Sequence, residues 1–78
     1  MTVGDLLYVC GNDLKIKVRV TKERKVRYNI IENRADIAYA SLSNEIKSKE
    51  VYNVYVDNAL GKGELLLYKP ILIINIEE

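Results

Sequence analysis

Few side chains in this sequence could carry catalytic chemistry. Histidine is absent, which removes the commonest general base and metal ligand near neutral pH. The single cysteine, Cys10, lies on an apolar stripe at the predicted C-terminus of a helix, where the helix dipole disfavours a thiolate. We therefore expect a packed core thiol rather than a nucleophile, and a lone cysteine excludes an intramolecular disulfide framework.

The acidic residues and the glycines form no recognisable motif either. The eleven acids show no spacing typical of a catalytic carboxylate pair or of a calcium loop. Gly61-Lys62-Gly63 lacks the further glycine, the following Ser or Thr and the helix that a phosphate-binding loop needs, so a plain turn is favoured there. We predict a protein that is not an enzyme, with no catalytic residues, no metal site and no cofactor.

The strongest functional signal is a basic stretch at positions 14 to 27. It holds seven of the twelve basic residues against a single acid, which leaves five basic and ten acidic residues for the rest of the chain. Such a segment could bind nucleic acid or another anionic partner by tracking a phosphate backbone. The candidate residues are Lys15, Lys17, Arg19, Arg24, Lys25 and Arg27.

A simpler interpretation of the basic stretch is that lysine and arginine are ordinary residues on the solvent face of a strand, where they also discourage edge aggregation. Aromatic residues do not interleave with the basic ones, since the alternation points Tyr28 inward. Base stacking is therefore missing, and any nucleic acid should be bound weakly and without sequence preference.

Tyrosine is the only aromatic residue type, with six copies, and it suits half-buried and interface positions. We place Tyr55, Tyr68, Ile71 and Ile73 on the sheet face opposite the N-terminal helix, as a candidate protein interface. An apolar patch there would favour a homodimer or a protein partner. Alternatively, the second helix and the segment 60–70 cover it.

The elements that must position these residues begin with a short helix. Thr2 and Asp5 form a capping-box pattern, and Gly11 offers a left-handed stop. One apolar stripe follows at helical spacing and consists of Val3, Leu6, Leu7 and Cys10. Two turns of helix are marginal alone, so this stripe must dock onto a sheet.

Alternating apolar and polar residues then predict a hairpin over 14–30. Its turn at 22–25 lacks Gly and Asn, which favours a four-residue type I connection over a two-residue primed turn. The chain leaves the sheet at 31–34. Asn33 then caps a second helix that ends near Leu42, and a loop follows at 44–49.

The C-terminal half predicts two more strands. The strand at 50–58 should direct Tyr52, Val54 and Val56 to the core. A turn at 60–63 and additional strand at 64–68 follow, and Pro70 fits a strand start. The last strand, 71–76, is apolar enough to need cover on both faces.

These elements predict one domain over residues 1–78 of the α+β class. Its architecture is two-layer, with a mainly antiparallel four-stranded sheet, a short N-terminal helix and a second short helix in the order α-β-β-α-β-β. Neither a leader sequence nor a long apolar stretch is present, so we expect no membrane association and a cytoplasmic location.

The chain also resembles a family of small uncharacterised α+β proteins of bacteriophages and prophages. The resemblance consists of the opening Thr2–Leu6, the segment Arg34-Ala35-Asp36 after an early hairpin, the strand Glu50–Asp57 and a terminal Ile-rich strand. It differs from the family pattern in its strongly basic hairpin and in segment 60–70, which looks like an insertion. The resemblance implies a mobile-element setting, hence the host cytoplasm, and no chemistry.

Together these observations favour a non-enzymatic protein that binds another macromolecule, as an accessory or inhibitor protein of a phage or mobile element. Its partner is then a protein that the sequence does not identify. The alternative is a nonspecific nucleic-acid-binding protein that uses the basic face of the 14–30 hairpin.

Overall fold

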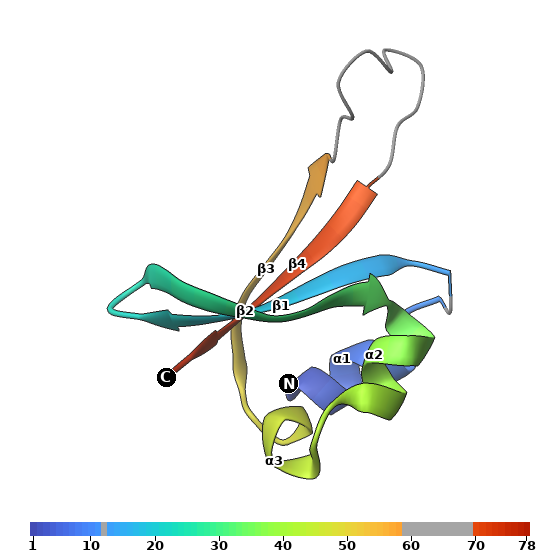
Figure 1. The fold of residues 1–78 in the computed structure, drawn as a ribbon, viewed down its shortest axis with the longest axis horizontal. Helices are drawn as coiled ribbons and strands as arrows, with labels where there is room; N and C mark the ends of the chain where they lie inside the picture. The colour runs from blue at the N-terminus through green and yellow to red at the C-terminus, as the bar shows by residue number, and fades with distance from the viewer. Residues whose placement is uncertain (12, 59–69) are drawn as a thin grey trace.

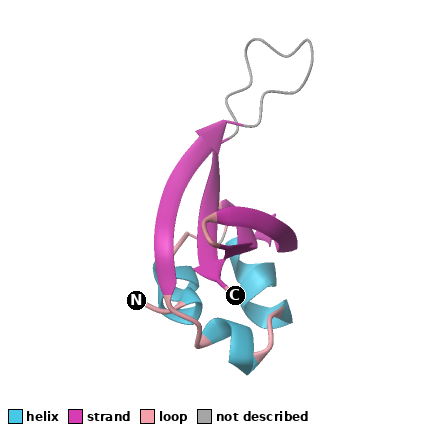
Figure 2. Ribbon diagram, turned by 90° about the vertical axis from the view of Figure 1, so that its left-hand side faces the viewer, coloured by secondary structure: helices cyan, strands magenta, loops and turns pink. Residues whose placement is uncertain are grey.

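The computed structural model describes residues 1–11, 13–58 and 70–78, which form three short helices and a four-stranded sheet (Figure 1). In chain order the elements are α1 (Val3–Val9), β1 (Lys15–Lys22), β2 (Lys25–Arg34), α2 (Ala35–Ser41), α3 (Asn44–Lys47), β3 (Val51–Asn58) and β4 (Pro70–Glu77). The α+β class is confirmed, and the helices gather on one side of the sheet (Figure 2). The predicted turn at 60–63 and strand at 64–68 lie outside the described residues.

The sheet has four strands, as predicted, and it is mixed: the predicted antiparallel pairing holds for two of its three ladders and not for the third. Its strand order is β2-β1-β4-β3. β1 pairs antiparallel with β2, and β3 pairs antiparallel with β4, but β1 and β4 are parallel. The cause is the helical connection α2–α3, which carries the chain from one edge of the sheet to the other, so that β3 runs in the same direction as β2. β4 is an inner strand, as its apolar sequence requires.

The hydrophobic core lies between the sheet and the helices. It contains Ile16, Val18 and Val20 of β1, Ile74 and Ile76 of β4, Val3 and Leu7 of α1, and Ala35, Ala38 and Leu42 of the α2 region. The apolar stripe predicted for the first helix is thus confirmed, with Leu6 and Cys10 packed partly against the same core. Burial raises the pKa of the Cys10 thiol, which keeps it protonated and unreactive near neutral pH.

Helix α1 begins as predicted and ends differently. The Asp5 N–H donates to Thr2 Oγ1 over 3.2 Å, and the Thr2 N–H donates back to Asp5 Oδ2 over 3.4 Å, which completes the capping box. The predicted glycine stop is wrong: Cys10 caps the helix in an extended conformation, and Gly11 has no left-handed φ. The chain leaves the helix through Cys10 and turns toward β1 at Gly11, whose carbonyl accepts from the Leu14 N–H.

The β1–β2 turn also corrects the sequence prediction. Lys22 pairs directly with Lys25, so the loop has only two residues, Glu23 with φ 52° and Arg24 with φ 66°. Positive φ at both central positions is the requirement of a type I′ turn, whose twist matches that of the strands. The twist of the sheet therefore overrides the poor local preference of Glu and Arg for this conformation.

The second helix is not capped by Asn33 as predicted. β2 keeps pairing with β1 as far as Arg34, which lies opposite Lys15, and Arg34 occupies the N-cap of α2 without a side-chain cap. Asn33 Oδ1 accepts instead from the Arg34 N–H over 2.8 Å. The predicted end of the helix near Leu42 is confirmed, because Leu42 is its C-cap.

The segment predicted as a loop at 44–49 contains the one-turn helix α3. Ser43 supplies the cap that the prediction overlooked, since its Oγ accepts from the Ile46 N–H over 3.3 Å. This turn packs beside α1 and completes the helical layer.

Candidate interaction surfaces

Part of each set of residues singled out from the sequence lies on one face of the sheet: Lys15, Lys17 and Arg19 of the basic set, and Tyr55, Ile71 and Ile73 of the interface set. Directly opposed residues of a ladder point to one face, and the registers place Lys17 beside Ile73 and Ile73 beside Tyr55. We call this face, opposite the helices, the open face. It carries Lys15, Lys17, Arg19 and Thr21 of β1, Ile71, Ile73, Asn75 and Glu77 of β4, and Asn53, Tyr55 and Asp57 of β3.

The apolar residues of the open face are not available as a binding patch. Ile71 and Ile73 are only 5% and 3% exposed, so the expected sticky surface made by these two residues is not present. Tyr55 is 41% exposed and can still be contacted. Tyr68, the fourth residue of this predicted interface, lies outside the described residues.

Arg19 and Tyr55, one from each predicted set, contact each other. Arg19 Nη2 donates to the Tyr55 hydroxyl over 2.6 Å, and its guanidinium carbon lies 5.7 Å from the centre of the Tyr55 ring. Arg19 Nε donates to Oδ1 of the buried Asn75 over 3.0 Å. The guanidinium is thus held within the fold by two hydrogen bonds and a cation–π contact, and it is not displayed toward solvent as a free cation.

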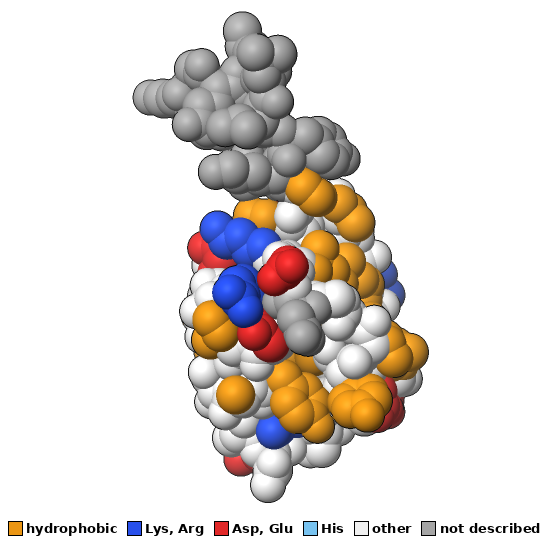
Figure 3. Space-filling model, turned by 90° about the vertical axis from the view of Figure 1, so that its right-hand side faces the viewer, with side chains coloured by type: hydrophobic (Ala, Val, Ile, Leu, Met, Phe, Trp, Pro, Cys, Tyr) orange, Lys and Arg blue, Asp and Glu red, His pale blue; other side chains and the backbone are white. Residues whose placement is uncertain are grey.

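Two further residues of the predicted basic site have acidic neighbours. Lys17 Nζ lies 3.6 Å from Glu32 Oε1 on β2, and Arg27 Nε lies 3.8 Å from Glu78 Oε2. The positive charge that is concentrated in the sequence is therefore offset in space by acids from elsewhere in the chain. Figure 3, which shows one face of the molecule, likewise has basic and acidic side chains side by side and hydrophobic ones in separate patches.

The remaining candidates of the basic site are exposed. Among the described residues, no ion-pair partner lies beside Lys15, Arg24 or Lys25. Arg24 and Lys25 sit at the hairpin turn, with the equally exposed Lys22 next to them, whereas Lys15 is at the opposite end of β1. Within the part of the chain that the structure describes, three cations without an ion-pair partner, Lys22, Arg24 and Lys25, therefore gather at the tip of the hairpin.

Tyr52, predicted for the core, reaches the open face instead. A register shift between Val51 and Asn53 lets the Tyr52 hydroxyl lie 2.5 Å from Thr21 Oγ1. Thr21 Oγ1 lies 2.8 Å from Glu77 Oε2. Because Thr has one hydroxyl hydrogen, Thr21 donates to the carboxylate and accepts from Tyr52.

The other two residues of β3 predicted for the core are poorly covered. Val54 and Val56 pair with Ile74 and Leu72, so they lie on the helix side of the sheet, but they are 40% and 60% exposed. The helical layer ends before it reaches them. β3 thus shows exposed aromatic and β-branched side chains on both faces.

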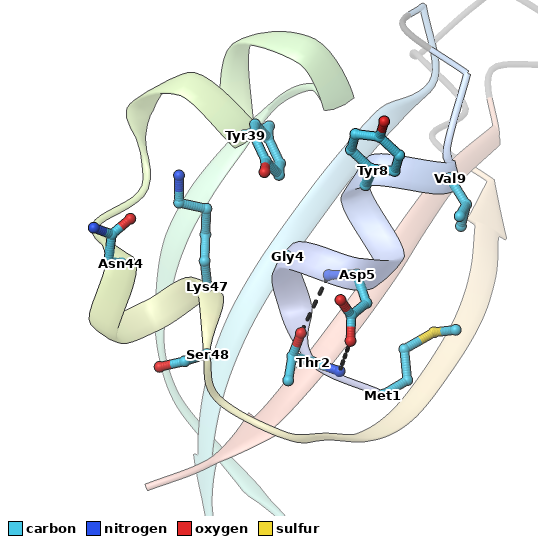
Figure 4. Close-up of a pocket in the computed structure, with 10 residues that line it drawn as sticks. All are labelled: Met1, Thr2, Gly4, Asp5, Tyr8, Val9, Tyr39, Asn44, Lys47 and Ser48. Atoms are coloured by element: carbon cyan, nitrogen blue, oxygen red, sulfur yellow. Dashed lines mark hydrogen bonds between the residues drawn. The ribbon is translucent and has the colours of Figure 1, made fainter.

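A groove between α1 and the α2–α3 region forms a second candidate site, which the sequence did not predict (Figure 4). Its volume is about 770 Å³. The Tyr8 ring of α1 and the Tyr39 ring of α2 lie next to each other in it, with their centres 6.4 Å apart and their planes tilted by 57°. The Lys47 ammonium lies 4.5 Å from the centre of the Tyr39 ring. We call this site the tyrosine groove; the residues that line it are Met1, Thr2, Gly4, Asp5, Tyr8, Val9, Tyr39, Asn44, Lys47 and Ser48.

Close packing of two helices gives the tyrosine groove its shape. A Cβ atom at Gly4 would lie 3.1 Å from the Lys47 carbonyl oxygen and 3.3 Å from Lys47 Cβ, so glycine is what lets α3 approach α1. Tyr8, at 79%, is the most exposed of the large hydrophobic residues described. One signal for it was available in the sequence, because Tyr8 falls off the apolar stripe of the first helix.

Two polar side chains of the tyrosine groove form hydrogen bonds within the fold. Asp5 belongs to the α1 cap, and Ser48 Oγ donates to the Glu45 carbonyl over 2.9 Å. Among the described residues, no three His, Cys, Asp or Glu side chains converge as metal ligands. The groove therefore offers two aromatic faces and one ammonium to a ligand.

Comparison of the chain with protein-family models, with curated proteins and with solved structures finds no match. In the described part of the chain, none of the helices has the length and apolar character needed to span a membrane.

Proposed function

We propose that this chain is a non-enzymatic interaction module that binds another protein through the tyrosine groove. The observation that carries the proposal is the exposure of Tyr8 beside Tyr39 in a concave site. Tyrosine is enriched in protein interfaces because it combines a large apolar area with a hydroxyl and loses little conformational entropy on contact. Tyr8 is little buried, so the fold gains little from it.

The groove favours one kind of partner segment. An apolar or aromatic side chain would pack against the shared surface of the Tyr8 and Tyr39 rings, which are in contact with each other. A concave shape and aromatic walls are typical of binding hot spots. An acidic group next to that side chain would be attracted by the Lys47 ammonium, which already lies against the Tyr39 ring. The partner is therefore a protein that presents an apolar anchor beside a carboxylate.

The biological setting that we propose is that of a phage or mobile element, in which the module acts as an accessory or inhibitor protein. This part of the proposal depends on the resemblance described above. One element of the resemblance has a structural explanation, because the opening Thr2–Leu6 contains the capping box of α1. The strand Glu50–Asp57, another element of the resemblance, has no such explanation in the fold, because much of β3 is exposed.

The experiment is affinity capture from a lysate of the organism that encodes the chain or of its host. Wild type is compared with two groove variants, Tyr8→Ala and Lys47→Glu, and with one control, Tyr28→Ala. The control removes an exposed tyrosine of β2 that does not line the groove. We expect one protein that is retained by wild type and by Tyr28→Ala and is lost from the two groove variants. Equal recovery by all four chains, or recovery of no specific protein, would contradict the proposal.

Nonspecific nucleic-acid binding is the second candidate, and one observation favours it. Lys22, Arg24 and Lys25 lie together at the hairpin tip and lack ion-pair partners among the described residues. Against it stand the internal contacts of Lys17, Arg19 and Arg27, which shrink the cationic surface that phosphates require.

A further inference from the structure

We infer that two copies of this chain pair antiparallel through the outer edges of β3, about a two-fold axis at Tyr55, so that the two sheets become one. β3 is an edge strand, and Figure 2 shows it rising along the rim of the molecule, clear of the helices for most of its length. The inference uses a surface other than the tyrosine groove and does not depend on the proposed function.

The two edges of the sheet differ in how they are protected against pairing. β2 carries charges at Lys25, Arg27, Glu32 and Arg34, and its pairing with β1 has two register shifts. Charged side chains and bulges are the devices with which natural sheets block an edge. β3 has the sequence VYNVYVDN, with Asp57 as its only charged residue and no proline. Its pairing with β4 has a single register shift, between Val51 and Asn53, which lies before the stretch from Val54 to Val56. The β2 edge is thus protected against pairing, whereas this stretch of the β3 edge is not.

The alternation of the β3–β4 ladder shows which backbone groups of β3 point outward. Pro70 has no N–H, so its pair with Asn58 is expected to be a non-hydrogen-bonded one. The pairs of Val56 with Leu72 and of Val54 with Ile74 are then of the same kind. The N–H and C=O groups of Val54 and Val56 therefore point away from β4, toward the open edge.

The start of the same edge is already occupied, in agreement with the alternation along β4. Val51 pairs with Ile76, two positions after Ile74, and the register shift before Asn53 accounts for the odd spacing between Val51 and Val54. The Val51 N–H donates outward to the Met1 carbonyl over 3.0 Å, and Thr2 forms an isolated bridge with Glu50. Beyond that point, no other described segment pairs with the outer side of β3. The stretch from 52 to 57 is long enough for a strand of ordinary length.

The edge is complementary to itself in one register. With the two-fold axis at Tyr55, Val54 lies opposite Val56 of the second copy, and these two symmetric pairs exchange the outward N–H and C=O groups. Tyr55 lies opposite Tyr55 of the second copy on the open face. Asp57 lies opposite Asn53 of the second copy, so like charges do not meet. Valine and tyrosine pairs are favourable cross-strand neighbours, and isologous pairing is the usual form of a homodimer.

The register gives a test by charge complementation at positions 54 and 56. One chain carries Val54→Lys with Val56→Lys, and a second carries Val54→Glu with Val56→Glu, so that each chain alone opposes like charges and the mixture opposes unlike ones. The control is Val26→Lys, on the blocked edge β2. Molecular mass is measured by light scattering from micromolar to high micromolar concentration, and circular dichroism checks that each variant is folded.

We expect wild type and Val26→Lys to reach twice the 8.9 kDa mass of the chain. The lysine and glutamate chains alone should dimerise about tenfold more weakly or worse, and the mixture should recover the dimer as a heterodimer. A wild-type chain that stays monomeric over the whole concentration range would overturn the inference. If that monomer binds an unrelated strand-forming peptide, the edge of β3 pairs with a foreign strand instead of a second copy. Two other results would also overturn it. One is that the lysine chain or the glutamate chain alone dimerises as strongly as wild type, and the other is that the mixture of folded variants stays monomeric.

Discussion

Tyr55 accepts a 2.6 Å hydrogen bond from the Arg19 guanidinium across the width of a strand, since β4 lies between the strands that carry the two residues. A residue predicted to bind nucleic acid and a residue predicted to bind protein thus satisfy each other. Long polar side chains on the open face of a sheet can connect strands that share no backbone ladder. The contact also orients Arg19 toward the buried Asn75, which links it to the inner strand.

Tyr55→Phe should lower the free energy of unfolding by about 0.5–1 kcal/mol, because it removes the hydroxyl acceptor and leaves the ring against the guanidinium. Tyr28→Phe is the matched control, since Tyr28 is exposed and none of the described hydrogen bonds involves its hydroxyl. The measurement is urea unfolding of both variants and of wild type at one protein concentration. Equal midpoints for Tyr55→Phe and Tyr28→Phe would show that the contact contributes nothing to stability.

Replacement of the hairpin turn should stabilise the protein. Glu23 and Arg24 both have positive φ, a conformation that costs about 1–2 kcal/mol for a residue with a side chain and little for Asn or Gly. Glu23→Asn with Arg24→Gly should therefore raise the free energy of unfolding by about 1–2 kcal/mol, and the Glu23 backbone N–H bond to Glu77 is retained. Chemical denaturation gives the value.

A glycine placed one position later should have the opposite effect. Lys25 belongs to β2 and is not among the residues with positive φ, so Lys25→Gly is expected to cost about 0.5–1 kcal/mol. If both variants destabilise the protein, the turn is not strained in the way that its φ angles indicate. A stabilised turn variant that binds its partner more weakly would mark Glu23 and Arg24 as residues kept for contact rather than for folding.

The sequence predicted those features that depend on local pattern. The capping box of Thr2 and Asp5, the stripe that includes Val3 and Leu7, and the apolar inner strand follow from spacing alone, and the structure confirms each of them. The hairpin turn was missed because the twist of two long strands, rather than the preference of Glu23 and Arg24, selects the turn type.

The candidate sites could be predicted less well, because they depend on contacts between distant segments. Lys17 looked like a free cation until the β1–β2 register placed Glu32 beside it. The parallel pairing of β1 with β4 depends on the path of the helical connection, which no local signal specifies. The tyrosine groove requires Tyr8 and Tyr39, from two different helices, to converge.

Gly4→Ala should destabilise the protein even though alanine is the better helix former. Alanine gains about 1 kcal/mol of helix propensity over glycine, but its Cβ would lie 3.1 Å from the Lys47 carbonyl oxygen, a backbone atom that must shift. Gly11→Ala is the control, because a Cβ there meets nothing within 4 Å. We expect a lower unfolding midpoint for Gly4→Ala and an unchanged or higher one for Gly11→Ala; the reverse order would mean that α3 moves freely away from α1.

Acid should weaken the start of α2 through Asp36. Arg34 donates to both carboxylate oxygens, over 3.1 and 2.6 Å, and this hydrogen bonding lowers the pKa of Asp36 below its ordinary value. A lowered folded pKa means that the stabilising effect is complete above the unfolded value of about 4 and is lost as the pH falls through the folded value.

The corresponding measurement is the thermal unfolding midpoint of wild type and Asp36→Asn between about pH 7 and pH 2. Wild type should lose part of its stability below about pH 4, and Asp36→Asn should lose less because it has no carboxylate to protonate. Glu45→Gln is the control, since no ion pair of Glu45 is formed within the described residues. Parallel pH profiles for wild type and Asp36→Asn would contradict the role given to Asp36.

Binding to nucleic acid, if it occurs, should have the small salt dependence of a three-cation site. Each phosphate neutralised on duplex DNA contributes about −0.9 to the slope of log K against log salt, so Lys22, Arg24 and Lys25 together give a slope of about −3. Engagement of the whole predicted set would give about −5. In an electrophoretic mobility shift assay, Arg24→Glu with Lys25→Glu should abolish the weak binding expected of wild type at low salt. Lys15→Glu, at the far end of β1, should leave it unchanged, because the hairpin tip then acts without the open face. A slope near −5, together with loss of binding in Lys15→Glu, would favour nucleic-acid binding over protein binding as the function of the chain. Such a result would mean that cations along the whole of β1 contact one phosphate backbone.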